Sequence, residues 1–166
     1  LGDLLVLVFF GVVPVYFTWY VCIPKALQGF NVWALTAGIG CGLVIDTLLL
    51  VNNYRDRDND KRDGKITLVV RIGARRTEQL YLYLPTLAEI IIFSIVMFNT
   101  SKPLLAAAIF IVLSALYFIP HTRTTNKLVA INHGKALNMV LGMTARDMLV
   151  FGLVSALQII LLYNPV

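Results

Sequence analysis

The sequence predicts an all-α protein, a polytopic bundle of five membrane-spanning helices, and three observations support this fold class. First, 58% of the 166 residues are hydrophobic and only 14% are charged, against about 45–50% and about 25% in an ordinary soluble domain. Second, the mean hydropathy is +0.79, and a globule of this length cannot bury so much apolar surface. Third, the apolar residues gather in five runs near the length of about 20 residues that a spanning helix needs. These observations exclude a soluble enzyme, a disordered chain and a disulfide-bonded secreted domain.

The five predicted spans follow one another along the whole chain. We expect Pro14 to kink the first span and small residues in the second to allow close packing of helices in lipid. The fourth is short and is expected to end at Pro120, so that residues 120–136 form a loop with His121 and His133 on its surface. The predicted spans cover residues 4–23, 33–51, 80–98, 104–119 and 137–162.

The basic residues predict which side of the membrane each connection occupies. With five spans, the N-terminus and residues 52–79 and 120–136 share one side, which holds eleven Lys and Arg, whereas the other side holds only Lys25 and Lys102. By the positive-inside rule, the long polar segment 52–79 lies on the cytoplasmic side of the membrane. We expect the protein to be integral to the cell (inner) membrane. Acidic residues are interspersed with these basic ones, which argues against a nucleic-acid partner.

The polar segment 52–79 is long for a connection between spans, which indicates a function of its own. Its first part, residues 52–63, contains neither proline nor glycine, so we expect it to continue the second helix into the cytoplasm. Gly64 is placed to end that helix, and Lys61 and Arg62 in the last turn favour the helix dipole.

Asp56 and Asp60 are the candidate metal ligands in this segment. They are four residues apart, so on a helix they project from one face, one turn apart. Mg²⁺ takes oxygen ligands and commonly bridges one or two carboxylates to substrate phosphates. A mixture of charges like this is also typical of a helix face exposed to solvent, and that alternative stays open. Side chains suited to phosphate oxygens surround the two acids: Arg55, Lys61, Lys65 and Arg71, with the amides Asn52 and Asn53. For Lys65 and Arg71 the alternative is a position at the membrane surface.

An acid inside the second span, Asp46, favours a functional site, because ionisable residues are costly within a membrane. If the helix continues at 100° per residue, Asp46, Asn53, Asp60 and Asp56 fall within an arc of about 80°. A stripe of oxygen-bearing side chains would then run along this helix from inside the membrane to its cytoplasmic surface. The alternative is that Asp46 only accepts a hydrogen bond from a hydroxyl group of a neighbouring helix.

Glu89 in the third span and the Arg146–Asp147 pair in the fifth are costly in lipid as well. We expect them to pair inside the bundle. A transporter, with an ion or proton pathway through Asp46, Glu89 and Asp147, is one alternative function, and a non-catalytic membrane subunit is another. Transport requires polar groups at both faces, and few approach the far side, which favours a site at the cytoplasmic mouth.

The pattern NNxRDxxxDxxxGKxTLxVRxG, from Asn52 through Asp56 and Asp60 to Gly73, closely resembles the second aspartate-rich motif of the UbiA superfamily of intramembrane prenyltransferases. Within it, the pattern looks most like that of the 1,4-dihydroxy-2-naphthoate polyprenyltransferases of menaquinone biosynthesis. Residues 1–21 and 137–157 are also similar to segments of those enzymes. The resemblance therefore covers most of the chain.

This resemblance implies nine transmembrane helices around a central cavity, with one aspartate motif after helix 2 and another after helix 6. The five predicted spans then correspond to helices 5–9, and residues 1–166 resemble the C-terminal half of such an enzyme. Only one copy of the motif is present. We therefore expect the N-terminal half of the same protein to be a partner and the fragment to be inactive alone.

The resemblance also implies the chemistry. The catalytic residues Asp56 and Asp60 would hold Mg²⁺ against the diphosphate of a polyprenyl diphosphate, in a membrane whose lipid solvates the chain. The prenyl group would pass to 1,4-dihydroxy-2-naphthoate with loss of CO₂, another aromatic acid being the alternative acceptor. The implied diphosphate contacts are Asn52, Asn53, Arg55, Lys65 and Arg71.

Overall fold

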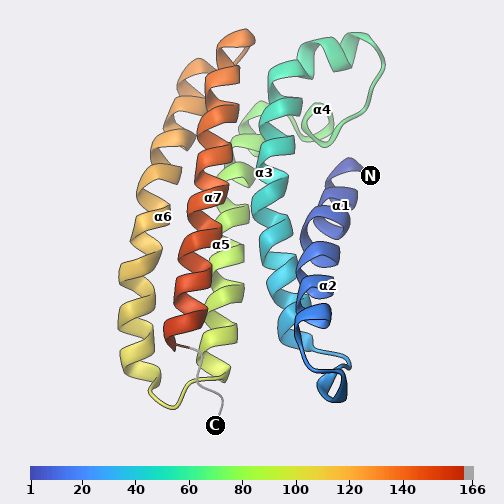
Figure 1. Cartoon of the computed structure of the whole chain (residues 1–166). Helices are drawn as coiled ribbons and strands as arrows, with labels where there is room; N and C mark the ends of the chain where they lie inside the picture. Colours follow the sequence, from blue (N-terminus) through green and yellow to red (C-terminus); the bar gives the residue numbers. More distant parts are fainter. Residues whose placement is uncertain (163–166) are drawn as a thin grey trace.

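The computed structural model describes residues 1–162, the side chain of Leu27 excepted, and contains helices and no strand in that part of the chain. Its long helices run side by side (Figure 1). The prediction of an all-helical bundle with five spans is confirmed, because five helices are long and apolar enough to cross a membrane. They cover Gly2–Cys22, Val32–Arg62, Ala74–Phe98, Pro103–Ile131 and Lys135–Leu162.

The first span consists of α1 (Gly2–Val6), six residues of π-helix (η1, Leu7–Val12) and α2 (Val13–Cys22). The π-helical turn lies immediately before Pro14, and the amide of Val13 donates to the carbonyl of Val8, five residues back. A proline ring clashes with the carbonyl four residues earlier, and the wider π turn relieves this clash. Where the sequence predicts a kink at Pro14, the structure shows a π-helical segment that ends at Val12.

Glycines bring η1 into backbone contact with α3 (Val32–Arg62). A Cβ atom on Gly11 would lie 2.4 Å from the Cα of Gly42, and one on Gly38 would lie 2.8 Å from the Cα of Val12. Side chains are therefore excluded at this crossing. Close packing through small residues, expected for the second span, is confirmed.

The α3 helix continues to Arg62, well beyond the apolar run, as the sequence predicts. It ends in a Schellman motif, because Gly64 has a φ of +72° while its amide donates to Lys61 and the amide of Lys65 donates to Asp60. The short helix α4 (Leu68–Ile72) follows, capped by the Thr67 hydroxyl. Residues 52–79 are thus mostly helical and fold back against α3.

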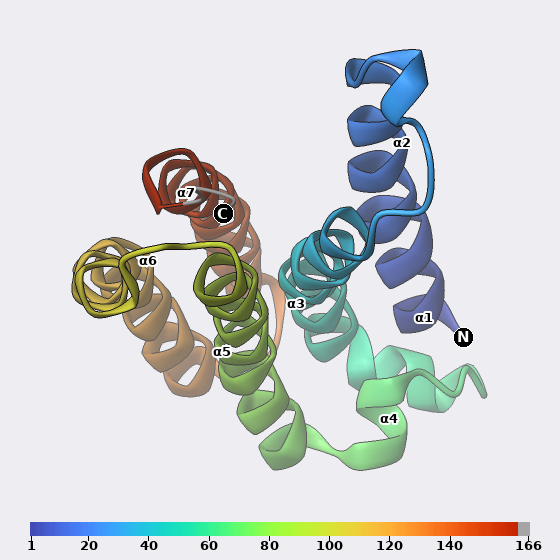
Figure 2. The same ribbon diagram turned by 90° about the horizontal axis from the view of Figure 1, so that it is seen from below.

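The α5 (Ala74–Phe98), α6 (Pro103–Ile131) and α7 (Asn138–Leu162) helices pack together on one side of α3. A short 3₁₀ turn, η3 (Lys135–Leu137), precedes α7. Figure 2 looks along the bundle and shows α3 between these three helices and the α1–α2 span. The third span, α5, begins at Ala74, whereas the run of apolar residues predicts a start at residue 80.

The prediction that the fourth span ends at Pro120 is wrong. The α6 helix passes through Pro120 to Ile131, and the Thr124 hydroxyl donates to the Pro120 carbonyl at 3.1 Å. His121, expected on a loop surface, is only 1% exposed and stacks between the rings of Tyr81 and Tyr117. The α6 helix therefore continues past the proline, which membrane bundles tolerate because neighbouring groups satisfy the freed backbone.

Two costly charges pair inside the bundle, as expected. Asp147 accepts hydrogen bonds from Thr124 at 2.5 Å and from Arg146 at 2.6 Å, and Glu89 accepts one from Ser114 at 2.8 Å. These contacts join α5, α6 and α7. They favour a structural part for the interior acids over an ion pathway through them.

Candidate functional site

Three cavities follow one another along α3, each lined by residues of both α3 and α7, and they are here together called the furrow. The α1–α2 span supplies further lining residues to two of them. The polar end, of about 460 Å³, is lined by Arg55, Asp56, Asn59, Gly134, Lys135 and Asn138. The middle, of about 650 Å³, is lined by Val6, Phe10, Ile45, Leu48, Leu49, Asn52, Leu141 and Met148. The far end, of about 330 Å³, is lined by Val15, Trp19, Asn31, Trp33, Ala34, Ala37, Ile95 and Ile159.

Arg55 is the centre of the polar end. Its guanidinium donates to both oxygens of Asp56, at 2.8 and 2.6 Å, and to the side-chain carbonyls of Asn52 at 2.9 Å and Asn138 at 2.8 Å. Such a planar, multiply bonded guanidinium is pre-organised for oxyanions. In this polar extension of α3, the hydrogen bonds from Arg55 lower the pKa of Asp56 below its ordinary value. Asp56 is therefore ionised at neutral pH.

Asp60 lies one turn further along α3 and is 8% exposed. Its Oδ1 atom is 3.2 Å from the Lys65 ammonium, a contact that the Schellman turn favours by folding Lys65 back over the helix end. Its Oδ2 atom is buried and has no hydrogen-bond partner among the described residues. The positive charge of Lys65 also helps to lower the pKa of Asp56, so this ammonium stabilises the negative charge of both acids.

The remaining predicted site residues are less tightly gathered. Asn53 is 7% exposed and lines a separate cavity of about 300 Å³ together with Lys65 and Thr67. Arg71 is exposed at the end of α4, and its side chain forms no hydrogen bond or ion pair with residues 1–162. The structure thus brings Asn52, Arg55 and Asp56 together and leaves Arg71 apart from them.

Asp46, Asn53 and Asp60 lie on one buried face of α3, seven residues apart, each less than 9% exposed. This agrees with the stripe of oxygen-bearing side chains predicted from the sequence. Asp46 accepts no side-chain hydrogen bond from the part of the chain that is described, and its Oδ1 atom is buried. The alternative that it bonds to a neighbouring hydroxyl group is therefore not supported.

Two asparagines to which the sequence assigned no role hold this end of α3: Asn138 contacts the site itself, and Asn132 contacts its neighbours Tyr54 and Arg57. Asn138, which begins α7, is 83 residues from Arg55 and holds its guanidinium. Asn132, with a φ of +61°, accepts from Arg57 through its backbone carbonyl at 2.5 Å and its side chain at 2.8 Å. It also lies 3.0 Å from the Tyr54 hydroxyl. Nothing in the local sequence predicts contacts so distant, although the side-chain amides themselves mark both positions as polar.

The donor set at the polar end fits a divalent cation of the magnesium type. Asp56 lines this cavity with both oxygens held by Arg55, and Asp60, one turn further along α3 and outside the lining, keeps a buried Oδ2 without a partner among the described residues. Both are hard oxygen donors, and Mg²⁺ is usually held by one or two carboxylates with water and substrate phosphates. No group of three or more acids, histidines or cysteines that could hold a metal occurs within the described residues. The residues present therefore fit an ion that is shared with a phosphorylated ligand, rather than an all-protein cage.

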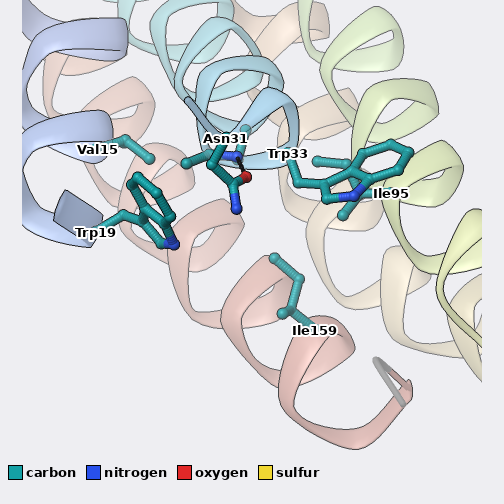
Figure 3. A pocket seen from close by; sticks show the side chains of 8 residues that line it. Val15, Trp19, Asn31, Trp33, Ile95 and Ile159 are labelled. Carbon is teal, nitrogen blue, oxygen red and sulfur yellow. Dashed lines mark hydrogen bonds between the residues drawn. The ribbon is translucent and has the colours of Figure 1, made fainter. Parts of the chain in front are cut away.

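Beyond Asn52 the furrow becomes apolar. Its middle is lined by aliphatic side chains and Phe10, and its far end is formed by two tryptophans on either side of Asn31 (Figure 3). The Asn31 side chain caps α3 by accepting from the Ala34 amide at 2.8 Å, so it is already satisfied. The furrow as a whole can accept a charged head group at one end and a long hydrocarbon chain along the rest.

Comparison with known proteins gives consistent matches. The model of the UbiA prenyltransferase family matches residues 1–133. A 1,4-dihydroxy-2-naphthoate octaprenyltransferase of Escherichia coli (strain K12) is 40% identical over 73 residues, which are 44% of this chain and 22% of that protein. The protein of the same name in Mycobacterium tuberculosis is 40% identical over 92 residues, 55% of this chain and 30% of that protein.

A longer match is with UbiA prenyltransferase domain-containing protein 1 of Ailuropoda melanoleuca, 30% identical over 159 residues, 94% of this chain and 43% of that protein. The chain thus spans less than half the length of these curated relatives. No solved structure matches it.

Proposed function

Because the chain belongs to the UbiA prenyltransferase family, we propose that it forms helices 5–9 of an intramembrane enzyme that transfers a polyprenyl group from polyprenyl diphosphate to an aromatic acid. The acceptor in this proposal is 1,4-dihydroxy-2-naphthoate, in menaquinone biosynthesis, since relatives at 40% identity carry that substrate in their names. The N-terminal half of the same protein would supply the first aspartate motif and close the furrow.

One observation carries the proposal, namely the order of polarity along the furrow. The Arg55–Asp56 cluster occupies one end, and the aliphatic middle and the tryptophan-lined far end follow it along α3. A polyprenyl diphosphate has the same order, with two phosphates at one end and a hydrocarbon chain beyond. A transporter would instead need polar groups along the whole path, and Asn52, next to the polar end, is the one polar residue among those that line the middle of the furrow.

In this proposal the diphosphate lies at the polar end. Arg55 faces it with positive charge, while Asn52 and Asn138 hold the Arg55 guanidinium in place. Lys65, which is paired with Asp60 and lines the neighbouring cavity, is the second proposed cation. Asn53 and Arg71 complete the proposed contact set, with Arg71 approaching from the exposed face of α4. Asp56 and Asp60 are the proposed ligands of Mg²⁺, which when bound would offset the negative charge that develops on the leaving diphosphate.

The chain's own residues would do the rest. As the bond between carbon and the diphosphate oxygen breaks, Arg55 donates to the phosphate oxygens, whose charge is rising. The allylic carbon that remains forms a bond to the ring carbon of the acceptor, and the acceptor's carboxylate leaves as CO₂. The apolar middle excludes the water that would otherwise capture the allylic cation. Phe10, the aromatic side chain of the middle furrow, can stabilise that cation through its ring face.

The five apolar helices make this a multi-pass membrane protein. We propose that it lies in the cell (inner) membrane with the polar end of the furrow facing the cytoplasm. The support is the count of eleven basic residues on that side against two on the other.

The test is product formation by the full-length protein with polyprenyl diphosphate, 1,4-dihydroxy-2-naphthoate and Mg²⁺. Asp60→Ala is expected to lower kcat by about 10²-fold or more, the usual effect of removing one charge-stabilising group. Asp63→Ala, a matched control at the exposed end of α3, should leave it unchanged. Equal activity of the two variants would contradict the site, and turnover by residues 1–166 alone would contradict the assignment as half of an enzyme.

A further inference from the structure

A hydrogen-bonded triad lies in the apolar interior of α5, α6 and α7, away from the furrow. The Ser114 hydroxyl donates to Glu89 Oε2 at 2.8 Å. The Gln158 amide donates to Ser114 Oγ at 2.9 Å and lies 3.5 Å from the same Glu89 oxygen. The three side chains are 4%, 7% and 0% exposed for Glu89, Ser114 and Gln158. The second carboxyl oxygen, Glu89 Oε1, is buried and has no partner among the described residues.

The triad borders an apolar groove between α5 and α6, here called the α5–α6 groove. Its volume is about 530 Å³, and Glu89 and Ser114 line it together with three phenylalanines, Phe93, Phe110 and Phe118. Ile111 at its edge is 68% exposed, so in a membrane the groove opens to the bilayer. None of its lining residues lines the furrow.

An unpartnered carboxyl oxygen in an apolar setting is unfavourable, since a buried polar group without a hydrogen bond costs free energy. A lipid acyl chain fills such a groove without satisfying Glu89. A hydroxyl group satisfies it in either protonation state, because a hydroxyl both donates and accepts. The phenylalanines favour an aromatic ring beside that hydroxyl, because aromatic rings pack edge-to-face, as Phe93 and Phe110 already do at a centroid distance of 5.0 Å.

We propose that the α5–α6 groove binds a lipid-soluble aromatic hydroxyl compound, with the hydroxyl on Glu89 and the ring among Phe93, Phe110 and Phe118. The choice of ligand rests on the proposed function, whose product, a prenylated naphthohydroquinone, has this chemistry. The groove would be a second binding site for that product, outside the furrow in which the product forms.

The test uses the full-length protein in nanodiscs of phosphatidylcholine under anaerobic, reducing conditions. Two labelled probes are compared by equilibrium binding, 2-geranyl-1,4-naphthohydroquinone and its dimethyl ether, which lacks the hydroxyl protons. Met148→Trp in the middle of the furrow is the background, so that binding in the furrow is blocked. We expect one remaining site that holds the hydroquinone at least tenfold more tightly than the ether.

Two further variants identify that site. Glu89→Leu should abolish the preference for the hydroquinone, and Ala115→Trp, at a groove position, should abolish binding of both probes while leaving the triad intact. Equal affinity for the two probes, a preference that survives Glu89→Leu, or binding unaffected by Ala115→Trp would overturn the proposal. If Glu89→Leu does not fold, Ala115→Trp decides alone. The probes are supplied ready-made, so failure of the groove is distinguishable from failure of the proposed enzyme activity.

Discussion

The hydrogen bond between Arg55 and Asn138 offers a sharp test of the polar end of the furrow. It joins α3 to the start of α7 at 2.8 Å, and Asn138 makes no other contact that the proposed mechanism needs. Asn138→Ala removes one of the four hydrogen bonds of the guanidinium and leaves the two to Asp56 and the one to Asn52. The expected consequence is a guanidinium that is less well positioned, with its charge unchanged.

A hydrogen bond to a charged group contributes about 1.5–3 kcal/mol. Asn138 is exposed, so water can replace part of its contribution, and we take the lower figure of about 1.5 kcal/mol. That corresponds to a loss of roughly tenfold in affinity or rate. The fold should be unaffected, because alanine is a better helix former than asparagine.

The assay is kcat/KM for polyprenyl diphosphate in the full-length enzyme. The matched control is Met139→Ala, the next residue of α7, which is 49% exposed and does not line the polar end. We expect roughly tenfold loss for Asn138→Ala and no loss for Met139→Ala. An unchanged kcat/KM for Asn138→Ala, or equal losses for both variants, would show that Asn138 does not position the Arg55 guanidinium.

Three further predictions concern packing and chain length. Gly11→Ala should lower the thermal midpoint of unfolding, because the added Cβ would lie 2.4 Å from the Cα of Gly42. Such overpacking lowers the free energy of unfolding by about 1–3 kcal/mol. The control Gly152→Ala, at a position with open space around it, should leave the midpoint unchanged. Asp147→Ala should cut the yield of folded protein in detergent, since it breaks a buried hydrogen-bonded network; a normal yield would count against that network. Ala37→Trp narrows the far end of the furrow and should shift the preference from long to short prenyl diphosphates; an unchanged ratio of products would argue that the chain lies elsewhere.

The sequence predicted the course of α3 well, and the reason is local. Residues 52–63 have no helix-breaking residue, and Gly64 supplies the left-handed conformation that the Schellman turn requires. The same turn places Lys65 over Asp60. Local rules of helix continuation and capping therefore suffice to build this part of the site.

The course of α6 was predicted badly, because a proline followed by polar residues resembles a loop. The residues His121, Thr124, Thr125 and Leu128 nevertheless recur with helical spacing, and all four are buried. The helical spacing of these residues indicates the helix better than hydropathy does, because a helix face that is buried in a bundle can be polar. The predicted loop was wrong because Pro120 does not end the helix: α6 runs through it to Ile131.

The contacts of Arg55 could be predicted only in part. Asn52 and Asp56 are its neighbours on the same helix, so helical geometry brings them within reach. Asn138 comes from α7, and only the packing of α7 against α3 places it there. Arg71 is exposed in the last turn of α4, and its distance in sequence from Arg55 gives no indication of this.

The most direct test of the central claim, that Asp56 and Asp60 hold a divalent cation for the diphosphate, is a count of bound ions. Mn²⁺ replaces Mg²⁺ at oxygen sites, and its electron paramagnetic resonance signal distinguishes free from bound ion. The full-length protein is titrated with Mn²⁺ in the presence of a polyprenyl thiodiphosphate that does not react. We expect the variant carrying both Asp56→Ala and Asp60→Ala to bind one ion fewer than the parent. An equal number of bound ions in the two proteins would contradict it.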